Sequence, residues 1–248
     1  MNSTRVRKAG EVYQVDPVAT HTTDQKHRRY VLLHDCNGES GIATLAYTST
    51  KDTERSRGAE AVVVHGSWMG IRNCGFSRRA LVYTSRLIPI ERHYLAASTG
   101  DTGHCWTTIQ ESLGRSLGLG KGTAAEGAKG SLRGTLVQVI APIALMIHTS
   151  YGVLVTEPEY SKVRHYQILV PLYPDPSRLR SGDLVIEGES WMREIRLSGG
   201  KGASKLLAEP RLALSIFYKT EVSRPLPGVV DSVSLSAIES GLRKHFGL

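Results

Sequence analysis

The second half of the chain repeats the first half, and this constrains the fold more than any other feature of the sequence. Six segments recur in the same order: AGEVYQV with RGTLVQV, YVLLHDC with YGVLVTEPEY, IATLAYTST with YQILVPLYP, VVVHGSWMGIR with LVIEGESWMREIR, RALVYTSRLIPIER with RLALSIFYKTEVSR, and TTIQESLGRSLGL with SAIESGLRKHFGL. Chance supplies one or two such matches but not their shared order. A period near half the chain is too long for a solenoid, so the repeat predicts two homologous domains.

A short segment between the copies divides the chain. Residues 120–131 are mostly Gly, Ala and Lys and have no apolar periodicity, which is typical of a flexible linker. The predicted domains are therefore residues 1–119 and residues 132–248, the second of them a degenerate copy.

Each half places short strands first and one helix last. The apolar residues of the two predicted helices recur at four-residue spacing: Ile109, Leu113 and Leu117 in the first half, and Ile238, Leu242 and Phe246 in the second. Thr107–Thr108 and Ser236 stand before them as predicted N-caps. The pattern predicts a mainly β fold with C-terminal helices (α+β), in the form of two tandem SH3-like small barrels, each followed by a helix.

Composition and charge narrow the class of protein. A mean hydropathy of -0.19 and 40% apolar residues predict a soluble globular chain. The longest apolar run, 136–155, is broken by polar residues, so it predicts two strands with a connection and no membrane span. The formal net charge of +8 favours a polyanionic partner, although many basic proteins bind no nucleic acid.

The cysteines and the first residues predict a compartment. The three cysteines, Cys36, Cys74 and Cys105, are widely spaced and no pair has metal-ligand spacing, which favours reduced thiols and no metal site. The opening residues lack the apolar core of a signal peptide. We therefore expect a cytoplasmic protein.

The stretch Thr23–Thr50 carries the candidate chemistry. A basic loop leads into a predicted strand at Tyr30–Leu33, and a Gly turn leads into a second strand at Ile42–Tyr47 that ends in hydroxyl side chains. In an antiparallel pair, the start of one strand lies beside the end of its neighbour. Arg28 and Arg29 should therefore lie beside Thr48 and Ser49, and guanidinium with hydroxyl donors at one point predicts a phosphate site.

This stretch resembles the MazF/PemK family of toxin endoribonucleases, which belongs to the Kid/CcdB superfamily. Gly10–Tyr13 match the family's opening strand, and Asp24–Gln25 stand where the family has Glu-Gln. Arg29 falls on the family's catalytic arginine and Thr48 on its catalytic hydroxyl. Tyr30 replaces the usual proline, which only stiffens the start of the strand, so the chemistry remains possible with this substitution.

The resemblance implies an SH3-like barrel and a metal-independent endoribonuclease of a toxin–antitoxin pair. Such an enzyme cleaves single-stranded RNA to 2′,3′-cyclic phosphate and 5′-hydroxyl ends without a cofactor, and an antitoxin protein occupies its groove. A tandem copy would form an intramolecular pseudo-dimer. The expected catalytic residues are Arg29, Thr48, His27 and Asp24, and the expected RNA-binding residues are Arg28, Gln25, Lys26, Ser49, Arg78, Arg79 and Arg86.

The two copies differ where this chemistry would be. Tyr151 stands near the position that repeats Arg29, and Tyr173 is expected at the position that repeats Thr48. The sequence therefore predicts one active half and one structural half, whose tyrosines either pack or stack on bases. An alternative is a non-catalytic toxin or regulatory module that acts by protein contact, as the related CcdB toxins do on gyrase, or by binding nucleic acid. An inert scaffold is a third reading.

Overall fold

The computed structural model divides the chain into two compact units, one built on residues up to Arg115 and the other on residues from Ser116 onward. It describes residues 6–20, 28–36, 41–50, 61–64, 76, 80–119, 133–139, 150–156, 166–174, 179–180, 182–197, 205–217 and 223–248. The predicted linker, 120–131, lies outside these ranges.

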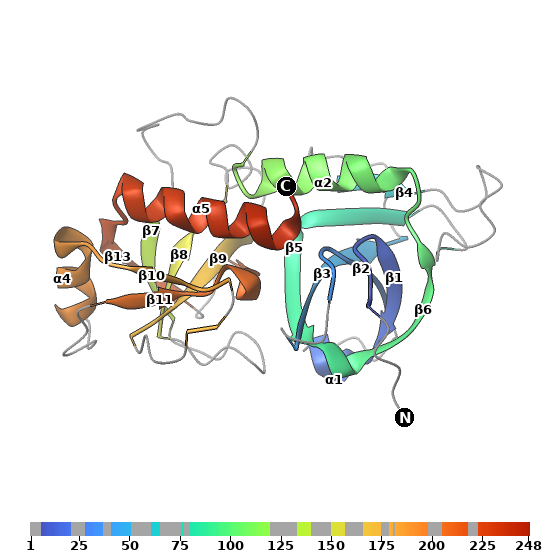
Figure 1. The fold of residues 1–248 in the computed structure, drawn as a ribbon, viewed down its shortest axis with the longest axis horizontal. Helices are drawn as coiled ribbons and strands as arrows, with labels where there is room; N and C mark the ends of the chain where they lie inside the picture. The colour runs from blue at the N-terminus through green and yellow to red at the C-terminus, as the bar shows by residue number, and fades with distance from the viewer. Residues whose placement is uncertain are drawn as a thin grey trace. The chain divides into compact units, whose positions relative to one another are not determined.

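The first unit is an antiparallel sheet with a helix at its end (Figure 1). In chain order its elements are β1 (Glu11–Val15), α1 (Pro17–Thr20), β2 (Arg28–Leu32), β3 (Ile42–Ser49), β4 (Ala61–Val64), β5 (Ala80–Glu91), the 3-10 turn η1 (Arg92–Tyr94), β6 (Leu95–Asp101) and α2 (Cys105–Ser116). The strands lie in the order β4-β5-β3-β2-β1-β6.

The second unit has the same strand order, with a helix between two of its strands. Its elements are β7 (Thr135–Val139), β8 (Tyr151–Leu154), β9 (Tyr166–Tyr173), β10 (Leu184–Ile186), α4 (Glu189–Leu197), β11 (Leu206–Ala208), the 3-10 turn η3 (Pro210–Leu212), β12 (Leu214–Phe217), β13 (Ser223–Val229) and α5 (Ser232–Phe246). The strands lie in the order β10-β11-β9-β8-β7-β13, and β12 also pairs with β9.

The prediction of a mainly β fold with C-terminal helices is confirmed. The apolar run 136–155 includes all of β8 and all of β7 except Thr135, as predicted, and their connection lies outside the described residues apart from Ser150. No helix in the described part of the chain is long and apolar enough to span a membrane. The described strands do not close either sheet on itself, so the closed SH3-like barrel remains a prediction.

Buried apolar side chains on one face of the first sheet make its core. Tyr13, Val15, Tyr30, Leu32 and Leu45 pack together in one cluster, and each is at least 98% buried. The opposite face is also covered, because the alternate positions of β2 and β3 are buried as well. This explains why these strands are nearly continuous apolar runs and do not alternate between polar and apolar residues.

Both terminal helices use the predicted apolar stripe, but they start earlier than predicted. Ile109, Leu113, Ile238 and Leu242 are fully buried. The helix α2 begins at Cys105, ahead of the predicted cap at Thr107–Thr108. In α5 the predicted cap Ser236 lies inside the helix, because the carboxylate of Asp231 accepts the Ser234 N–H at 2.8 Å and starts the helix there.

The first strand of each unit is fixed by a glycine in the left-handed region. Gly10 has φ 85° and Gly134 has φ 78°. The Gly10 N–H donates to Leu32 O at 2.8 Å, and the Gly134 N–H donates to Leu154 O at 2.7 Å. A Cβ at either glycine would meet a neighbouring side chain at 3.1 Å or less. These two positions therefore have the same backbone requirement, and glycine meets it.

Strand register corrects one of the six sequence matches. Leu81 of β5 pairs with Ser49, and Leu207 of β11 pairs with Tyr173, at corresponding positions of β3 and β9. The segment that repeats β5 therefore begins near Leu206, and the sequence match that began at Arg211 was wrong. Leucine and alanine are frequent throughout this region, so an alignment by letters shifted along the strand.

His34 supplies a hydrogen bond inside the first sheet that requires a neutral ring. The Thr44 N–H donates to Nε2 at 3.1 Å, so the ring proton must lie on Nδ1, which is 3.1 Å from Asp35 O. Burial lowers the pKa of His34 from its ordinary value of 6.5, more than the Asp35 carbonyl and carboxylate raise it. Protonation of Nε2 would place two N–H groups against each other.

We predict that the first unit loses stability as pH falls below about 6.5. The folded state holds His34 neutral while the unfolded chain takes up a proton, which costs up to about 1.4 kcal/mol for each pH unit across that window. Amide hydrogen exchange at β3 measures this loss. His34→Gln, which keeps an acceptor, should flatten the pH dependence, whereas His93→Gln at the exposed His93 should not. An unchanged dependence in His34→Gln would contradict the assignment.

Candidate functional site

The ends of β2 and β3 bring the predicted arginine and hydroxyl together. Tyr30 pairs with Tyr47, so Arg29 and Thr48 are the next residues outward on the two antiparallel strands. The Thr48 hydroxyl donates to the Arg29 backbone carbonyl. Thr48 is 6% exposed, while Arg29 is partly exposed. In this arrangement Thr48 holds the backbone that carries the Arg29 side chain.

Strand alternation separates the predicted residues onto two faces. Directly opposite residues share a face and successive residues alternate, so Arg29 and Thr48 share one face. Arg28, Tyr47 and Ser49 share the other face, which also carries the buried core cluster. The predicted basic and hydroxyl side chains therefore form two groups at the same strand ends, one on each face of the sheet.

Tyr47 gathers two arginines. The Arg28 Nη1 donates to the Tyr47 hydroxyl, and the Arg28 Cζ lies 5.3 Å from the centroid of the Tyr47 ring. The Arg86 Cζ lies 3.8 Å from the same centroid. Tyr30 and Tyr83 contact Tyr47 with ring centroids at 6.2 and 5.9 Å. We call Arg28, Tyr47 and Arg86 the Arg–Tyr–Arg cluster.

A bulge in β5 brings Arg86 to this cluster. Along β3, Tyr47 pairs with Tyr83 and the next residue, Ala46, pairs with Leu87. Three residues of β5, ending in Arg86, are therefore extra, and the strand bends where they are inserted. The sequence identified Arg86 as a candidate but gave no sign of Tyr47, because the bulge that joins them has no sequence signature here.

The other predicted residues cannot be placed. Asp24, Gln25, Lys26, His27, Arg78 and Arg79 lie outside the described residues.

The second unit lacks the arginine and the hydroxyl at the equivalent positions. Gln14 of β1 pairs with Arg29, and Gln138 of β7 pairs with Tyr151, so Tyr151 is the equivalent of Arg29 as predicted. The equivalent of Thr48 is Leu172, because these two residues pair with corresponding positions of β5 and β11. Placing Tyr173 there was wrong by one residue, and this shift moves a side chain to the other face.

The second unit also lacks the Arg–Tyr–Arg cluster. The same register equates Arg28 with Ser150, Tyr47 with Pro171 and Arg86 with Leu212, and none of the three replacements carries a charge. The turn η3 stands where β5 has its bulge, so both units interrupt the same strand at the same place.

The terminal helix meets this interruption in both units. In the first unit, the hydroxyls of Thr84 and Ser112 lie 2.9 Å apart and join the bulge to α2. In the second unit, a Cβ at Gly241 of α5 would lie 2.8 Å from the Pro210 Cγ. The terminal helix therefore packs on the interrupted strand in both units, through a hydroxyl pair in the first and a close apolar contact in the second.

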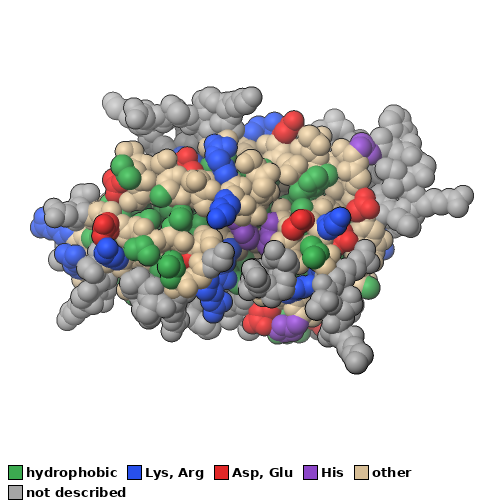
Figure 2. All heavy atoms as spheres, viewed as in Figure 1, with side chains coloured by type: hydrophobic (Ala, Val, Ile, Leu, Met, Phe, Trp, Pro, Cys, Tyr) green, Lys and Arg blue, Asp and Glu red, His purple; other side chains and the backbone are tan. Residues whose placement is uncertain are grey.

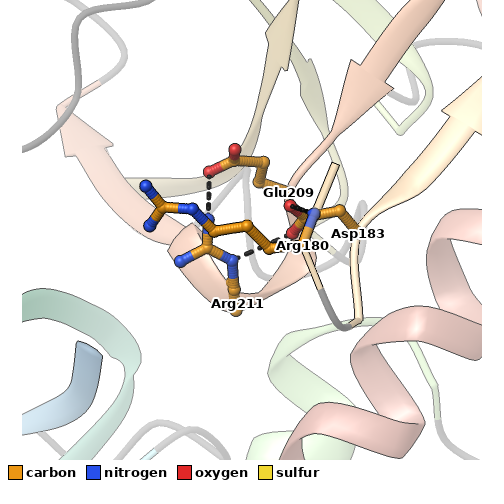
Figure 3. A network of polar contacts seen from close by, with 4 residues as sticks. All are labelled: Arg180, Asp183, Glu209 and Arg211. Atoms are coloured by element: carbon orange, nitrogen blue, oxygen red, sulfur yellow. Dashed lines mark hydrogen bonds and ion pairs between the residues drawn. The ribbon is translucent and has the colours of Figure 1, made fainter. Parts of the chain in front are cut away.

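A buried ion network occupies the interruption of the second unit (Figure 3). The Arg211 Nε donates to Asp183 at 2.9 Å and its Nη2 to Glu209 at 3.0 Å, and the Arg180 N–H donates to Asp183 at 2.9 Å. The Arg211, Asp183 and Glu209 side chains are 5%, 0% and 8% exposed. Burial raises the pKa of Glu209 from its ordinary value of 4.5, and Arg211 offsets part of that rise.

Surface charge does not delimit the site by itself. On the face that Figure 2 shows, basic and acidic side chains are interspersed. Among the described residues, no three His, Cys, Asp or Glu side chains form a group that could hold a metal ion. The local geometry of the strand ends is therefore the basis for any functional assignment.

Comparison with known proteins adds little to this geometry. No family of known proteins matches the chain, and no curated protein matches it. One similar solved structure is an endoribonuclease in complex with its cognate antitoxin, from a mycobacterial species. It is 14% identical, and the match covers 46% of this chain and 96% of that one with a TM-score of 0.34. A TM-score this low does not establish a shared fold.

We predict that Arg211→Leu destabilises the second unit by about 3–5 kcal/mol at pH 7, because it leaves two buried carboxylates without their cation. Urea unfolding combined with hydrogen exchange in β9 and α5 measures the loss. Arg180→Leu is the matched control, since Arg180 is exposed and contributes its backbone N–H.

The destabilisation caused by Arg211→Leu should become smaller as the pH falls toward about 4.5. A raised carboxyl pKa means that the folded unit holds a proton more tightly than the unfolded chain, so stability from Glu209 rises on acidification. Without Arg211 the pKa of Glu209 rises further. This widens the pH range over which acidification stabilises the second unit. A pH-independent deficit would show that the network contributes through packing alone.

Proposed function

We propose that the chain is a metal-independent endoribonuclease, the toxin of a toxin–antitoxin pair, and that its first unit cleaves single-stranded RNA. A cognate antitoxin protein is the proposed inhibitory partner. The observation that carries the proposal is the meeting of Arg29 and Thr48 at the paired ends of β2 and β3. The neighbouring Arg28 and Arg86 add two more guanidinium groups at the same rim.

RNA chemistry defines what the protein has to supply. The ribose 2′-hydroxyl is an internal nucleophile, so the protein must orient the phosphate, stabilise its added negative charge and move protons. In the proposed mechanism Arg29 stabilises that charge. His27, with Asp24 to orient it, is the proposed proton carrier. The products are a 2′,3′-cyclic phosphate and a 5′-hydroxyl.

The geometry suggests a positioning role for Thr48 in this mechanism. Its hydroxyl proton is donated to the Arg29 carbonyl and its side chain is buried. Thr48 therefore fixes the Arg29 backbone at the strand end. Ser49 is partly exposed on the other face of the sheet, beside Arg28 and Tyr47. Its hydroxyl is the one proposed to donate to a phosphate oxygen.

We also infer that the two units are tandem copies and that the second has lost the site. The same strand order, the left-handed glycines Gly10 and Gly134, and the interruption at the same place support a common ancestor. The loss of both Arg29 and Thr48 equivalents supports a structural role for the second unit. The proposal includes an intramolecular pseudo-dimer of these copies.

A non-catalytic binding protein is the second candidate. The observation that favours it is the engagement of the Thr48 hydroxyl by the Arg29 backbone, because a binding protein needs no available hydroxyl at that point. Such a protein would bind nucleic acid or a protein target through the same rim.

Incubation of the purified full chain with a long single-stranded RNA in EDTA tests the proposal. We expect discrete fragments with cyclic phosphate ends. Arg29→Ala should reduce cleavage by about 100- to 1000-fold, because it removes the proposed charge-stabilising donor. Arg193→Ala is the matched control, since Arg193 is an exposed arginine of α4 in the second unit.

Thr48→Val tests the contribution of the hydroxyl, because valine keeps the shape of the side chain and loses the hydrogen bond. A fall in cleavage comparable to that of Arg29→Ala supports its place in the site. Intact RNA with the wild-type protein would reject the nuclease. If that protein still slowed growth on expression, the binding protein would become the better account.

A further inference from the structure

We propose that Tyr47 positions Arg28 and Arg86 as a two-armed clamp for one backbone phosphate of single-stranded RNA. The inference rests on the proposed function, because it says where the first unit holds its RNA. It assigns a positioning role to Tyr47, and it assigns to Arg28 and Arg86 one shared ligand.

Two different interactions attach the arginines to one ring. Arg28 donates a hydrogen bond to the Tyr47 hydroxyl and Arg86 lies over the ring face. Because their Cζ atoms lie 5.3 and 3.8 Å from one centroid, the two guanidinium groups are within about 9 Å of each other. Within that upper limit, one planar fork can reach a phosphate from each side.

The charges favour an anion between the two arms. Each guanidinium group is permanently charged and carries several N–H donors, so each can make a charge-assisted contact with a phosphate oxygen. All three residues of the cluster are partly exposed, so a ligand can reach them.

Rigid surroundings hold the ring in place. Tyr47 packs between the rings of Tyr30 and Tyr83, which are 1% and 7% exposed. The β5 bulge places Arg86 on the ring from one strand, while Arg28 reaches it from β2. Pre-organisation of both arms before binding lowers the cost of ordering long side chains.

The clamp belongs to the first unit alone, and RNA is the favoured source of the phosphate. Ser150, Pro171 and Leu212 stand at the equivalent positions of the second unit and cannot form it. Arg29 is adjacent to the cluster along β2, and the chain carries a net charge of +8, so a polyanion gains from longer-range attraction as well.

Salt-dependent binding of a short single-stranded RNA to the full chain tests the clamp. We expect Tyr47→Leu to weaken binding by about tenfold at moderate salt and to reduce the salt slope by about 0.7, the value for one phosphate contact on a single strand. Arg86→Gln should give the same slope, and Tyr47→Leu with Arg86→Gln should lower it no further, because both act on one phosphate. Tyr47→Phe keeps the ring beneath Arg86 but removes the hydroxyl that holds Arg28, so it should weaken binding by less than Tyr47→Leu does.

Matched variants separate positioning from folding. Tyr94→Phe removes a tyrosine hydroxyl elsewhere in the first unit and should leave the slope unchanged. If Tyr47→Leu does not fold, Arg28→Gln and Arg86→Gln, alone and together, carry the same comparison. A wild-type slope in the folded variants would overturn the clamp and leave the nuclease untouched.

The failure of the proposed function gives a different result. RNA binding with the expected slopes but without cleavage would reject the nuclease and retain the clamp. No binding of RNA by the wild-type chain would overturn the clamp. Binding of polyglutamate in place of RNA would also overturn it, and would identify the cluster as a contact for an acidic protein segment.

Discussion

The pairing register of β2 against β3 is the constraint on which the site depends. Because Tyr30 pairs with Tyr47, Arg29 and Thr48 meet at the strand ends, and Arg28 falls on the face that carries Tyr47. A shift of one residue would exchange these faces and move Tyr30 and Leu32 away from the core cluster. The buried cluster around Tyr30, Leu32 and Leu45 opposes such a shift, so the core and the site are specified by the same strand contacts.

The interruption of β5 is the second determinant, and the two units use it differently. In the first unit its inserted residues place Arg86 on Tyr47 at a partly exposed rim. In the second unit the same place carries Arg211, which is buried between Asp183 and Glu209. The second unit therefore neutralises its cation with internal carboxylates. This difference between the two units supports the proposal of a duplicated scaffold with one binding copy and one structural copy.

The sequence predicted the features that follow from periodicity and order. The repeat, the strands around Tyr30 and Ile42, and the apolar stripes of the terminal helices are properties of local pattern, and the described residues bear out the strands and the stripes. Helix starts were wrong because Asp231, and not the serine inside α5, has the geometry of a cap. The role of Tyr47 could not be predicted, because it depends on a bulge in a strand more than thirty residues away.

Photo-crosslinking is the measurement that most directly tests the claim of one active and one structural copy. A single-stranded RNA carrying 4-thiouridine would be cross-linked to the full chain, and the modified peptides identified by mass spectrometry. The account predicts cross-links to peptides that contain β2, the end of β3 and the bulge of β5, with none to the equivalent segments β8, β9 and η3. Cross-links confined to the second unit, or spread equally over both, would contradict it.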